Sequence, residues 1–224
     1  SPDHVIRTKG APLNITNAAD YNNKTALKNH IKDFSKRYTK YFDRQARKSN
    51  EKKTILTTDP KHGWLRDVGI IGVGKNAKEA SAAADLAEQN LHVRISSEKY
   101  GGFFPLKEKD MFDCEYWSLE QAKLGKGSPP TFQGKVVIVT GGAGTIGLET
   151  AKAFSQLGAN ILLVDNNKKL LDLALSKLTV WDKSVCCDIT DRSSAKKVME
   201  AAIWNFGGLD ILVSNAGNAS SGEG

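Results

Sequence analysis

A glycine-rich segment in the second half of the chain has the residue types and spacing of a phosphate-binding turn. It reads TGGAGTIG, starts at Thr140 and follows the apolar run VVIV. A pyrophosphate requires close backbone approach, free N–H donors and a favourable helix dipole, which a glycine-rich turn at a helix N-terminus supplies. The G-x-G-x-x-G pattern lies between a predicted strand and a predicted helix. The residues expected to bind a dinucleotide here are Gly141, Gly142, Gly144, Thr145, Ile146 and Gly147.

An acidic residue after the next predicted strand completes this pattern. Asp165 follows Gly147 by 18 residues, close to the ~20 expected for the acid that binds the adenosine ribose. A carboxylate can accept both ribose hydroxyls and would repel a 2′-phosphate. The sequence therefore favours NAD as the cofactor. NADP stays an alternative, because Lys168 and Lys169 follow closely.

The second half of the chain alternates strands and helices. Near-continuous apolar strands between amphipathic helices specify a parallel sheet that is covered on both faces. The expected fold class is α/β: a C-terminal Rossmann-type parallel sheet with helices on both faces, truncated to about four strands, preceded by a smaller α/β segment. The strands are expected at residues 135–140, 160–165, 184–188 and 210–214.

A glycine- and proline-containing stretch, GKGSPPTFQG, separates two parts of the chain that differ in charge and pattern. We expect a first domain at residues 1–124, a linker at 125–133 and a second domain at 134–224. In the first domain, we expect a short strand at residues 4–7, a long basic helix at 20–47 and a buried strand at 68–73.

The net charge of +7 comes entirely from the residues before Gly134. Lys24 to Lys53 alone carry eleven basic and three acidic residues. Because apolar residues recur through this segment at helical spacing, most lysines are expected on its solvated face. Nucleic-acid binding stays a minor alternative, and we expect no nucleic-acid partner. The apolar residues are Leu27, Ile31, Phe34, Tyr38 and Phe42.

Residues 134–217 resemble the N-terminal half of a short-chain dehydrogenase/reductase. The resemblance rests on the glycine-rich turn, on Asp165, on Asp188-Ile189 after the third strand and on Asn215-Ala216-Gly217 after the fourth. It implies that Asp188 and Ile189 hold the adenine, while residues 215–217 flank the ribose and the nicotinamide. Two positions depart from the usual pattern: Thr145 makes the turn closer to TGxxGxxG, and Ser214 replaces the first Asn of Asn-Asn-Ala-Gly.

The proton-transfer residues of that family are missing from the chain. They are a Ser and a Tyr-x-x-x-Lys pair, in which the lysine lowers the pKa of the tyrosine. None of the tyrosines of this chain has a lysine four residues later. We therefore assign no catalytic residue, and we expect the chain alone to be inactive.

The first domain resembles the C-terminal part of a class II aldolase/adducin-like domain. The resemblance rests on SPDHVIRTKGAPL, GIIGVGKNAKEA and DMFDCEYWSLEQAKL. Val68 stands where single-function members have a metal-binding histidine, so we expect no metal site. The whole chain is similar to bifunctional enzymes that join such a domain to a short-chain dehydrogenase, as in the rhamnulose-phosphate aldolase/lactaldehyde dehydrogenase type.

The sequence thus predicts a fragment of an NAD(P)-dependent oxidoreductase that acts on an alcohol or aldehyde from sugar metabolism. Two alternatives stay open: a fragment of a metal-dependent sugar-phosphate aldolase, and a non-catalytic dinucleotide-binding module. We expect a small-molecule substrate, a homo-oligomer and no membrane partner, since no apolar run approaches the ~20 residues of a span. The three cysteines form no disulfide framework, which favours the cytoplasm.

Overall fold

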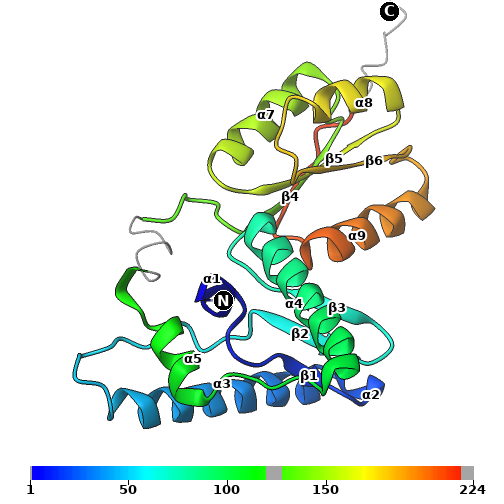
Figure 1. Cartoon of the computed structure of the whole chain (residues 1–224). Helices are drawn as coiled ribbons and strands as arrows, with labels where there is room; N and C mark the ends of the chain where they lie inside the picture. The colour runs from blue at the N-terminus through cyan, green and yellow to red at the C-terminus, as the bar shows by residue number, and fades with distance from the viewer. Residues whose placement is uncertain (1, 120–127, 218–224) are drawn as a thin grey trace, which may run out of the picture. The chain divides into compact units, whose positions relative to one another are not determined.

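The computed structural model describes residues 2–119 and 128–217 (Figure 1). Its chain forms two compact units. The first unit contains residues 1–74 and 78–127, and the second contains residues 75–77 and 128–224. The two units are described separately below.

The first unit combines helices with a three-stranded mixed sheet (Figure 1). The sheet order is β1-β2-β3, where β1 and β2 are parallel and β2 and β3 form an antiparallel hairpin. The strands are β1 (Leu13–Ile15), β2 (His62–Leu65) and β3 (Gly69–Gly72). The helices are α1 (Pro2–Thr8), α2 (Ala18–Tyr21), α3 (Lys24–Ala46), α4 (Ala77–Ser97), the short 3₁₀ helix η1 (Glu98–Tyr100) and α5 (Glu108–Glu115).

Helix α3 covers this unit's core with one face. Its buried residues Phe34, Tyr38 and Tyr41 recur at helical spacing and pack with residues of β1 and α5. Their rings lie against Phe112 and Tyr116, which are stacked with ring centroids 4.6 Å apart. The opposite face of α3 carries charged residues in water, as expected for an amphipathic surface helix.

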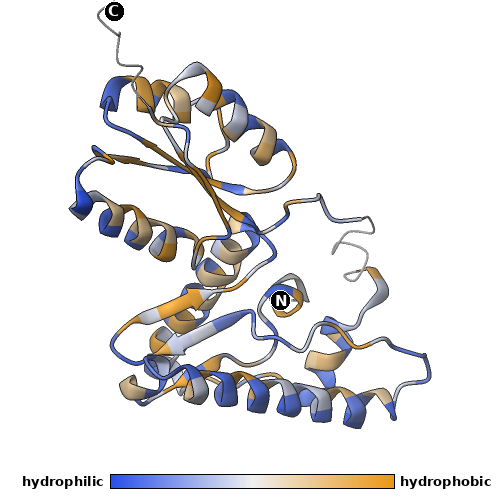
Figure 2. Cartoon of the chain, turned by 180° about the vertical axis from the view of Figure 1, so that it is seen from behind, coloured by the Kyte–Doolittle hydropathy of each residue, from blue (hydrophilic) through white to orange (hydrophobic). Residues whose placement is uncertain are grey.

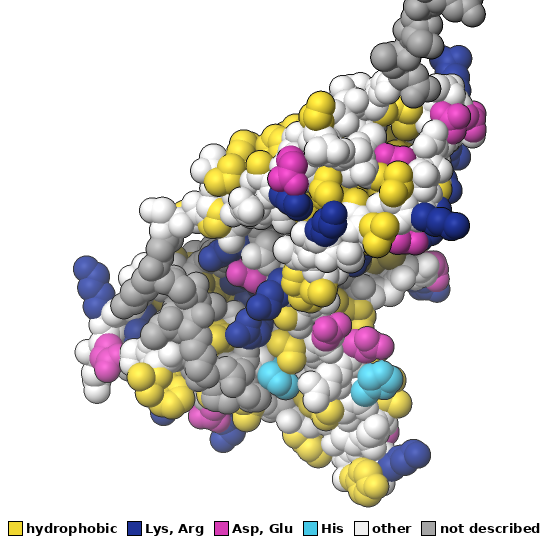
Figure 3. Space-filling model, turned by 90° about the horizontal axis from the view of Figure 1, so that it is seen from above, with side chains coloured by type: hydrophobic (Ala, Val, Ile, Leu, Met, Phe, Trp, Pro, Cys, Tyr) yellow, Lys and Arg dark blue, Asp and Glu magenta, His cyan; other side chains and the backbone are white. Residues whose placement is uncertain are grey.

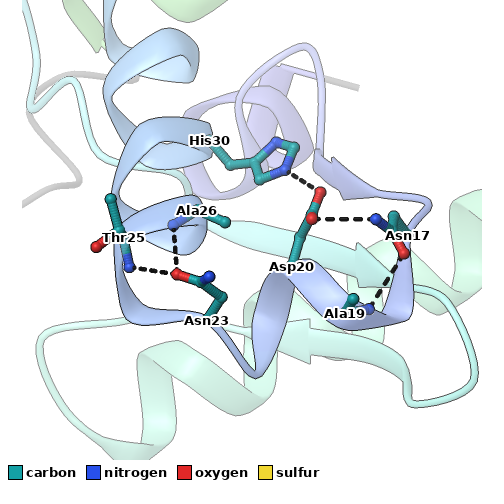
Figure 4. A network of polar contacts seen from close by, with 7 residues as sticks. All are labelled: Asn17, Ala19, Asp20, Asn23, Thr25, Ala26 and His30. Carbon is teal, nitrogen blue, oxygen red and sulfur yellow. Dashed lines mark hydrogen bonds and ion pairs between the residues drawn. The ribbon is translucent and has the colours of Figure 1, made fainter.

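The long basic helix expected at residues 20–47 is interrupted by two asparagines. Helix α2 ends at Tyr21, and Asn23 starts α3 by accepting hydrogen bonds from the N–H groups of Thr25 and Ala26 (Figure 4). Such a cap satisfies N–H groups that have no partner within the helix. Asp20 Oδ2 lies 2.8 Å from His30 Nε2, and this hydrogen bond connects α2 to α3 (Figure 4).

Two other expectations for the first unit are wrong. Residues 4–7 belong to helix α1, whose Ile6 is buried, and not to a strand. The expected buried strand at 68–73 is the shorter β3, an edge strand of its sheet on which Ile71 is 37% exposed. In both cases a short apolar run did not distinguish a strand from a helix, or a central strand from an edge strand.

The second unit is a parallel sheet between two layers of helices (Figure 1). The sheet order is β6-β5-β4-β7. Its strands are β4 (Val136–Thr140), β5 (Asn160–Asp165), β6 (Lys183–Cys186) and β7 (Ile211–Val213). Its helices are α7 (Thr145–Gln156), α8 (Lys168–Leu175) and α9 (Arg192–Phe206).

Alternate residues of the central strands supply two cores, one on each face of the sheet. Val137, Val139, Ile161 and Leu163 pack with α7 and α8. Ile138, Leu162 and Val164 pack on the opposite face with Val198 and Ala202 of α9. The strands are accordingly hydrophobic along their length (Figure 2). Burial on both faces is the physical reason why the strand sequences lack polar alternation.

The expected fold class requires a correction. The segment before the Rossmann-type sheet was expected to be the smaller part, but residues 1–74 and 78–127 make the first unit the larger one. The fold is mixed α/β, with the parallel sheet C-terminal to the first unit.

Charged and hydrophobic side chains are interspersed on the face seen from above (Figure 3). No helix among the described residues is long and apolar enough to cross a bilayer.

Candidate functional site

A cavity of about 440 Å³ lies at the carboxyl ends of the strands of the parallel sheet. Carboxyl ends of neighbouring parallel strands meet at one edge, where open α/β sheets bind ligands. Eleven of the twelve predicted site residues line this cavity; the exception is Gly142. The lining residues are Gly141, Gly144, Thr145, Ile146, Gly147, Val164, Asp165, Asn166, Cys187, Asp188, Ile189, Asn215, Ala216 and Gly217.

The glycines of the turn have different roles. Gly141 has a φ of +61°, a backbone angle that residues with a side chain rarely adopt. A Cβ on Gly147 would lie 2.2 Å from the carbonyl oxygen of Gly141, so only glycine lets the helix approach the turn. A Cβ on Gly142 would meet Leu163 at 2.8 Å, so this glycine packs on the sheet. Gly144 has ordinary backbone angles and faces the cavity.

The first turn of α7 offers backbone donors to the cavity. Gly144 is the N-cap, and no side chain caps this helix. The first N–H groups of a helix have no carbonyl partner within the helix, and the helix dipole adds partial positive charge there. Thr145, Ile146 and Gly147 lie in this first turn and line the cavity. The turn is thus suited to an anion such as a pyrophosphate.

Asp165, the last residue of β5, links the second strand to the glycine-rich turn. Its Oδ2 accepts a hydrogen bond from the N–H of Ala143 at 3.1 Å. Its Oδ1 accepts one from the N–H of Asn167 at 3.0 Å. Each carboxylate oxygen has a further lone pair for a ligand hydroxyl. The carboxylate is therefore held in one orientation at the cavity wall.

Thr140 joins the ends of β4 and β7. Its hydroxyl accepts hydrogen bonds from the N–H groups of Asn215 and Ala216, at 3.0 and 3.1 Å, and donates to the carbonyl of Val213. In return, the side-chain amide of Asn215 donates to the carbonyls of Thr140 and Gly141, at 3.1 and 3.2 Å. The two motifs, 75 residues apart in sequence, form one hydrogen-bonded unit.

The third strand contributes a polar and an apolar side chain to the cavity. Asp188 accepts hydrogen bonds from the N–H and hydroxyl of Thr190, and the backbone bond is the main reason why the pKa of Asp188 is lowered. Ile189 is 42% exposed, and Ile146 of the glycine-rich turn is 74% exposed. These two apolar side chains give the cavity surfaces on which a flat ring can pack.

Three lining residues were not identified from the sequence: Val164, Asn166 and Cys187. Each lies within two residues of a predicted site residue at a strand end, and that position is the signal that could have found them. Cys186 and Cys187 are both half-buried. They face opposite cores, as successive residues of an extended chain should.

No group of three His, Cys, Asp or Glu side chains suited to a metal lies within residues 2–119 and 128–217. Val68, which stands at the position of a metal-binding histidine in the resemblance, is 45% exposed.

Comparisons with known families assign each unit. Residues 135–223 match the family model of the short chain dehydrogenases, so the second unit is similar to this family. Residues 1–124 match the model described as aldolase class II, second domain. Since this second match covers more than half of the chain, the chain belongs to the class II aldolase second-domain family.

The chain is also similar to individual proteins. The uncharacterized oxidoreductase YuxG of Bacillus subtilis is 28% identical over 98% of this chain and 33% of its own length. A sorbose reductase of Schizosaccharomyces pombe is 39% identical over 40% of this chain and 37% of its own length. Among solved structures, a citronellol catabolism dehydrogenase of Pseudomonas aeruginosa PAO1 is 28% identical, with a TM-score of 0.38, over 42% of this chain and 40% of its own. The chain thus spans less than half the length of these relatives.

These matches correct the resemblance drawn from the sequence. That resemblance interpreted residues 1–124 as the C-terminal part of a class II aldolase/adducin-like domain and residues 134–217 as the N-terminal half of a dehydrogenase. The family models place the aldolase-type unit first, at residues 1–124, and describe it as a second domain. The dehydrogenase follows at residues 135–223.

Proposed function

We propose that the second unit is the NAD-binding part of a short-chain dehydrogenase that oxidises or reduces a small alcohol or aldehyde. The observation that carries the proposal is the convergence of the four strand ends on one cavity, with Asp165 and the first turn of α7 in its wall. When bound, the oxidised cofactor would accept the hydride from an alcohol, and the reduced cofactor would donate it to an aldehyde. The chain's own residues bind and orient the cofactor.

Each part of a dinucleotide has a suitable wall in the cavity. The N–H groups of the first turn of α7 fit the pyrophosphate, because they combine free donors with the helix dipole. Asp165 fits the hydroxyls of the adenosine ribose. Ile189 offers an apolar surface for the adenine, and the segment Asn215–Gly217 provides the wall beside the glycine-rich turn for the second ribose and nicotinamide. The hydrogen bonds between Thr140 and Asn215 hold these last two walls together.

The charge of the cavity favours NAD over NADP. Asp165 and Asp188 are its charged residues, and no Lys or Arg is found among the described residues that line it. Lys168 is not in the lining and pairs with Asp172 on α8. A 2′-phosphate would therefore meet carboxylates without a compensating cation.

Calorimetric titration with NADH and NADPH tests the proposal. We expect measurable NADH binding that Asp165→Ala weakens at least about tenfold, which is about 1.4 kcal/mol. Asp172→Ala is the matched control, because it removes the same charge from an exposed position outside the cavity. It should leave NADH binding unchanged. An absence of heat with both nucleotides would contradict the proposal.

We also propose that the substrate is an alcohol or aldehyde from sugar metabolism and that the proton-transfer residues lie in a part of the protein beyond this chain. The similarity to a sorbose reductase supports the substrate class. The chain's coverage of a third of its Bacillus subtilis relative supports the second point. The coding sequence after Gly224 tests it: a Tyr-x-x-x-Lys pair is expected, and its absence would favour a non-catalytic binding module.

A homo-oligomer in the cytoplasm completes the proposal. Strands β6 and β7 are both edges of their sheet, and α9 exposes Ile203 and Trp204. Unpaired edges and exposed apolar side chains favour association. The cysteines Cys114, Cys186 and Cys187 are free thiols, which suits a reducing compartment. Light scattering should give a mass above 24.3 kDa that rises with concentration; a constant monomer mass would contradict the oligomer.

A further inference from the structure

The first unit contains a second cavity, of about 310 Å³, that the dehydrogenase site does not use. Its walls come from α1, β2, α4 and the segment Phe103–Leu106. Most of the lining is apolar or aromatic, and none of the described lining residues is acidic. The charged or titratable nitrogens there belong to His4, Lys9, His62 and Arg94. The cavity therefore has a positive wall with no acidic side chain among its described lining residues, although Glu115 and Asp59 lie near enough to Lys9 to raise its pKa.

Arg94 is the cation best placed to receive a ligand. Its guanidinium carbon lies 4.7 Å from the ring centroid of Phe103 and 5.2 Å from that of Trp64. Its Nε donates to Asn90 Oδ1 at 2.9 Å. Among the described residues Arg94 has no ion-pair partner, so the N–H groups of its two terminal nitrogens are available to a ligand. Two aromatic contacts and one hydrogen bond hold the planar group in place.

His62 and Trp64 add polar atoms whose hydrogen bonding is incomplete. His62 is only 6% exposed, and its Nδ1 donates a hydrogen bond to the carbonyl of Thr8 at 3.0 Å. In the neutral ring, Nε2 is then unprotonated and can accept a hydrogen bond. Burial, with the charge of Arg94, lowers the pKa of His62. The indole Nε1 of Trp64 is buried without a hydrogen-bond partner among the described residues. An unsatisfied buried donor costs about 1–3 kcal/mol, which a bound acceptor would offset.

Lys9 contributes charge to the same wall but is already bonded. Its Nζ donates to the carbonyl of Thr57 and lies 3.3 Å from the ring centroid of Tyr38. Arg94 therefore remains the principal donor to an anion, and a single guanidinium edge matches the two oxygens of one carboxylate. A phosphate dianion usually needs more hydrogen-bond donors than one guanidinium provides. The backbone N–H groups at the N-terminus of α7 in the second unit are an example of such a site.

We propose that this cavity binds a small organic carboxylate, with its charged group on the terminal nitrogens of Arg94 and its apolar body against Trp64 and Phe103. The absence of acidic lining residues selects for an anion. The apolar walls exclude a fully hydrated inorganic ion, because they offer it no hydrogen bonds. The site lies in the first unit and is independent of the dinucleotide cavity.

Nuclear magnetic resonance of the whole chain, ¹⁵N-labelled at tryptophan, can test this proposal. Trp64 supplies the reporter signal, which Trp64→Phe identifies among the four indole signals. The probes are phenylacetate, its neutral isostere phenylacetamide, and phenyl phosphate. We expect a saturable shift of the Trp64 signal with phenylacetate and binding at least about tenfold weaker with the amide, since about 1.4 kcal/mol separates them.

Two variants distinguish binding at Arg94 from a general effect of the positive charge of the chain. Arg94→Gln should weaken phenylacetate binding at least about tenfold. Lys99→Gln is the matched control, because Lys99 is exposed, lies outside the cavity and carries the same charge. Equal shifts with the acid and the amide, or no saturable shift, would overturn the proposal even if Arg94→Gln failed to fold. Tighter binding of phenyl phosphate would overturn the choice of a carboxylate.

Discussion

Asp165 Oδ2 accepts a hydrogen bond from the N–H of Ala143 at 3.1 Å, which fixes the last residue of β5 to the glycine-rich turn after β4. The same carboxylate that we propose to bind the ribose therefore also holds the phosphate-binding turn. A substitution of Asp165 can therefore have two effects: it can move the glycine-rich turn, and it can remove negative charge from the cavity. An informative variant changes only one of them.

Asp165→Asn makes that separation. The amide oxygen can still accept one backbone N–H, but the negative charge is lost. We expect the ratio of NADPH to NADH dissociation constants to fall towards one, because the repulsion of the 2′-phosphate disappears. Titration of both nucleotides measures the ratio. A ratio identical to that of the unchanged chain would show that the carboxylate does not select the cofactor.

The two glycines Gly144 and Gly147 should respond differently to alanine. Gly147→Ala brings a methyl group to 2.2 Å from the carbonyl oxygen of Gly141, so we expect a loss of roughly 1–3 kcal/mol in unfolding free energy. Gly144→Ala meets only that oxygen, at 3.3 Å, and should cost no more than about 1 kcal/mol.

Gly144→Ala should nevertheless weaken NADH binding at least about tenfold, because its methyl group enters the cavity wall where the pyrophosphate is expected. Chemical denaturation and NADH titration together test the pair. Unaltered NADH binding by a folded Gly144→Ala chain would place the dinucleotide elsewhere.

Thr140 provides a test of the link between the two motifs. Thr140→Val keeps the shape but removes the acceptor of the Asn215 and Ala216 N–H groups, so we expect a loss of about 1–3 kcal/mol in stability. Thr140→Ser keeps the hydroxyl and should remain closer to the unchanged chain. Denaturation of the two variants measures the difference. Equal stabilities would mean that the hydroxyl does not hold the ends of β4 and β7 together.

Lys9 makes the stability of the first unit depend on pH. Burial is the main cause that lowers the pKa of Lys9 from 10.5 to about 8 in the folded chain. Between these two values the unfolded chain binds more protons, so stability rises as pH increases from about 8 and is lowest below it. The difference in pKa corresponds to ~3 kcal/mol, because each unit is worth about 1.4 kcal/mol.

Lys9→Met removes the titrating amine and keeps a long side chain at this buried position. We expect the increase in unfolding free energy between about pH 7.5 and pH 9.5 to disappear in this variant, as linkage requires. Urea denaturation across that interval is the measurement. The variant Lys61→Met, at a half-buried neighbour of the same charge, should retain most of the increase. Loss of the increase in Lys61→Met but not in Lys9→Met would contradict the assignment to Lys9.

The elements of the second unit could be predicted from the sequence because their signals are local. Strand β5, for example, has five buried residues in a row and lies between segments with helical periodicity. In the first unit, local signals were weaker. Residues 4–7 form a helix whose Ile6 is buried, and strands β1 and β2 were not identified at all. Short segments take their structure from the surfaces they pack against, which no local pattern contains.

The sequence by itself determined which residues follow the strand ends of the second unit, and parallel topology then required these residues to meet. Only the tertiary structure decided how they are held: the Thr140 hydroxyl bonds to residues 215 and 216, and Asp165 bonds to Ala143. It also decided that His62, Trp64 and Arg94 line one cavity, although 32 residues separate the first from the last. Motif spacing reflects local backbone geometry, whereas contacts between distant side chains depend on how whole elements pack.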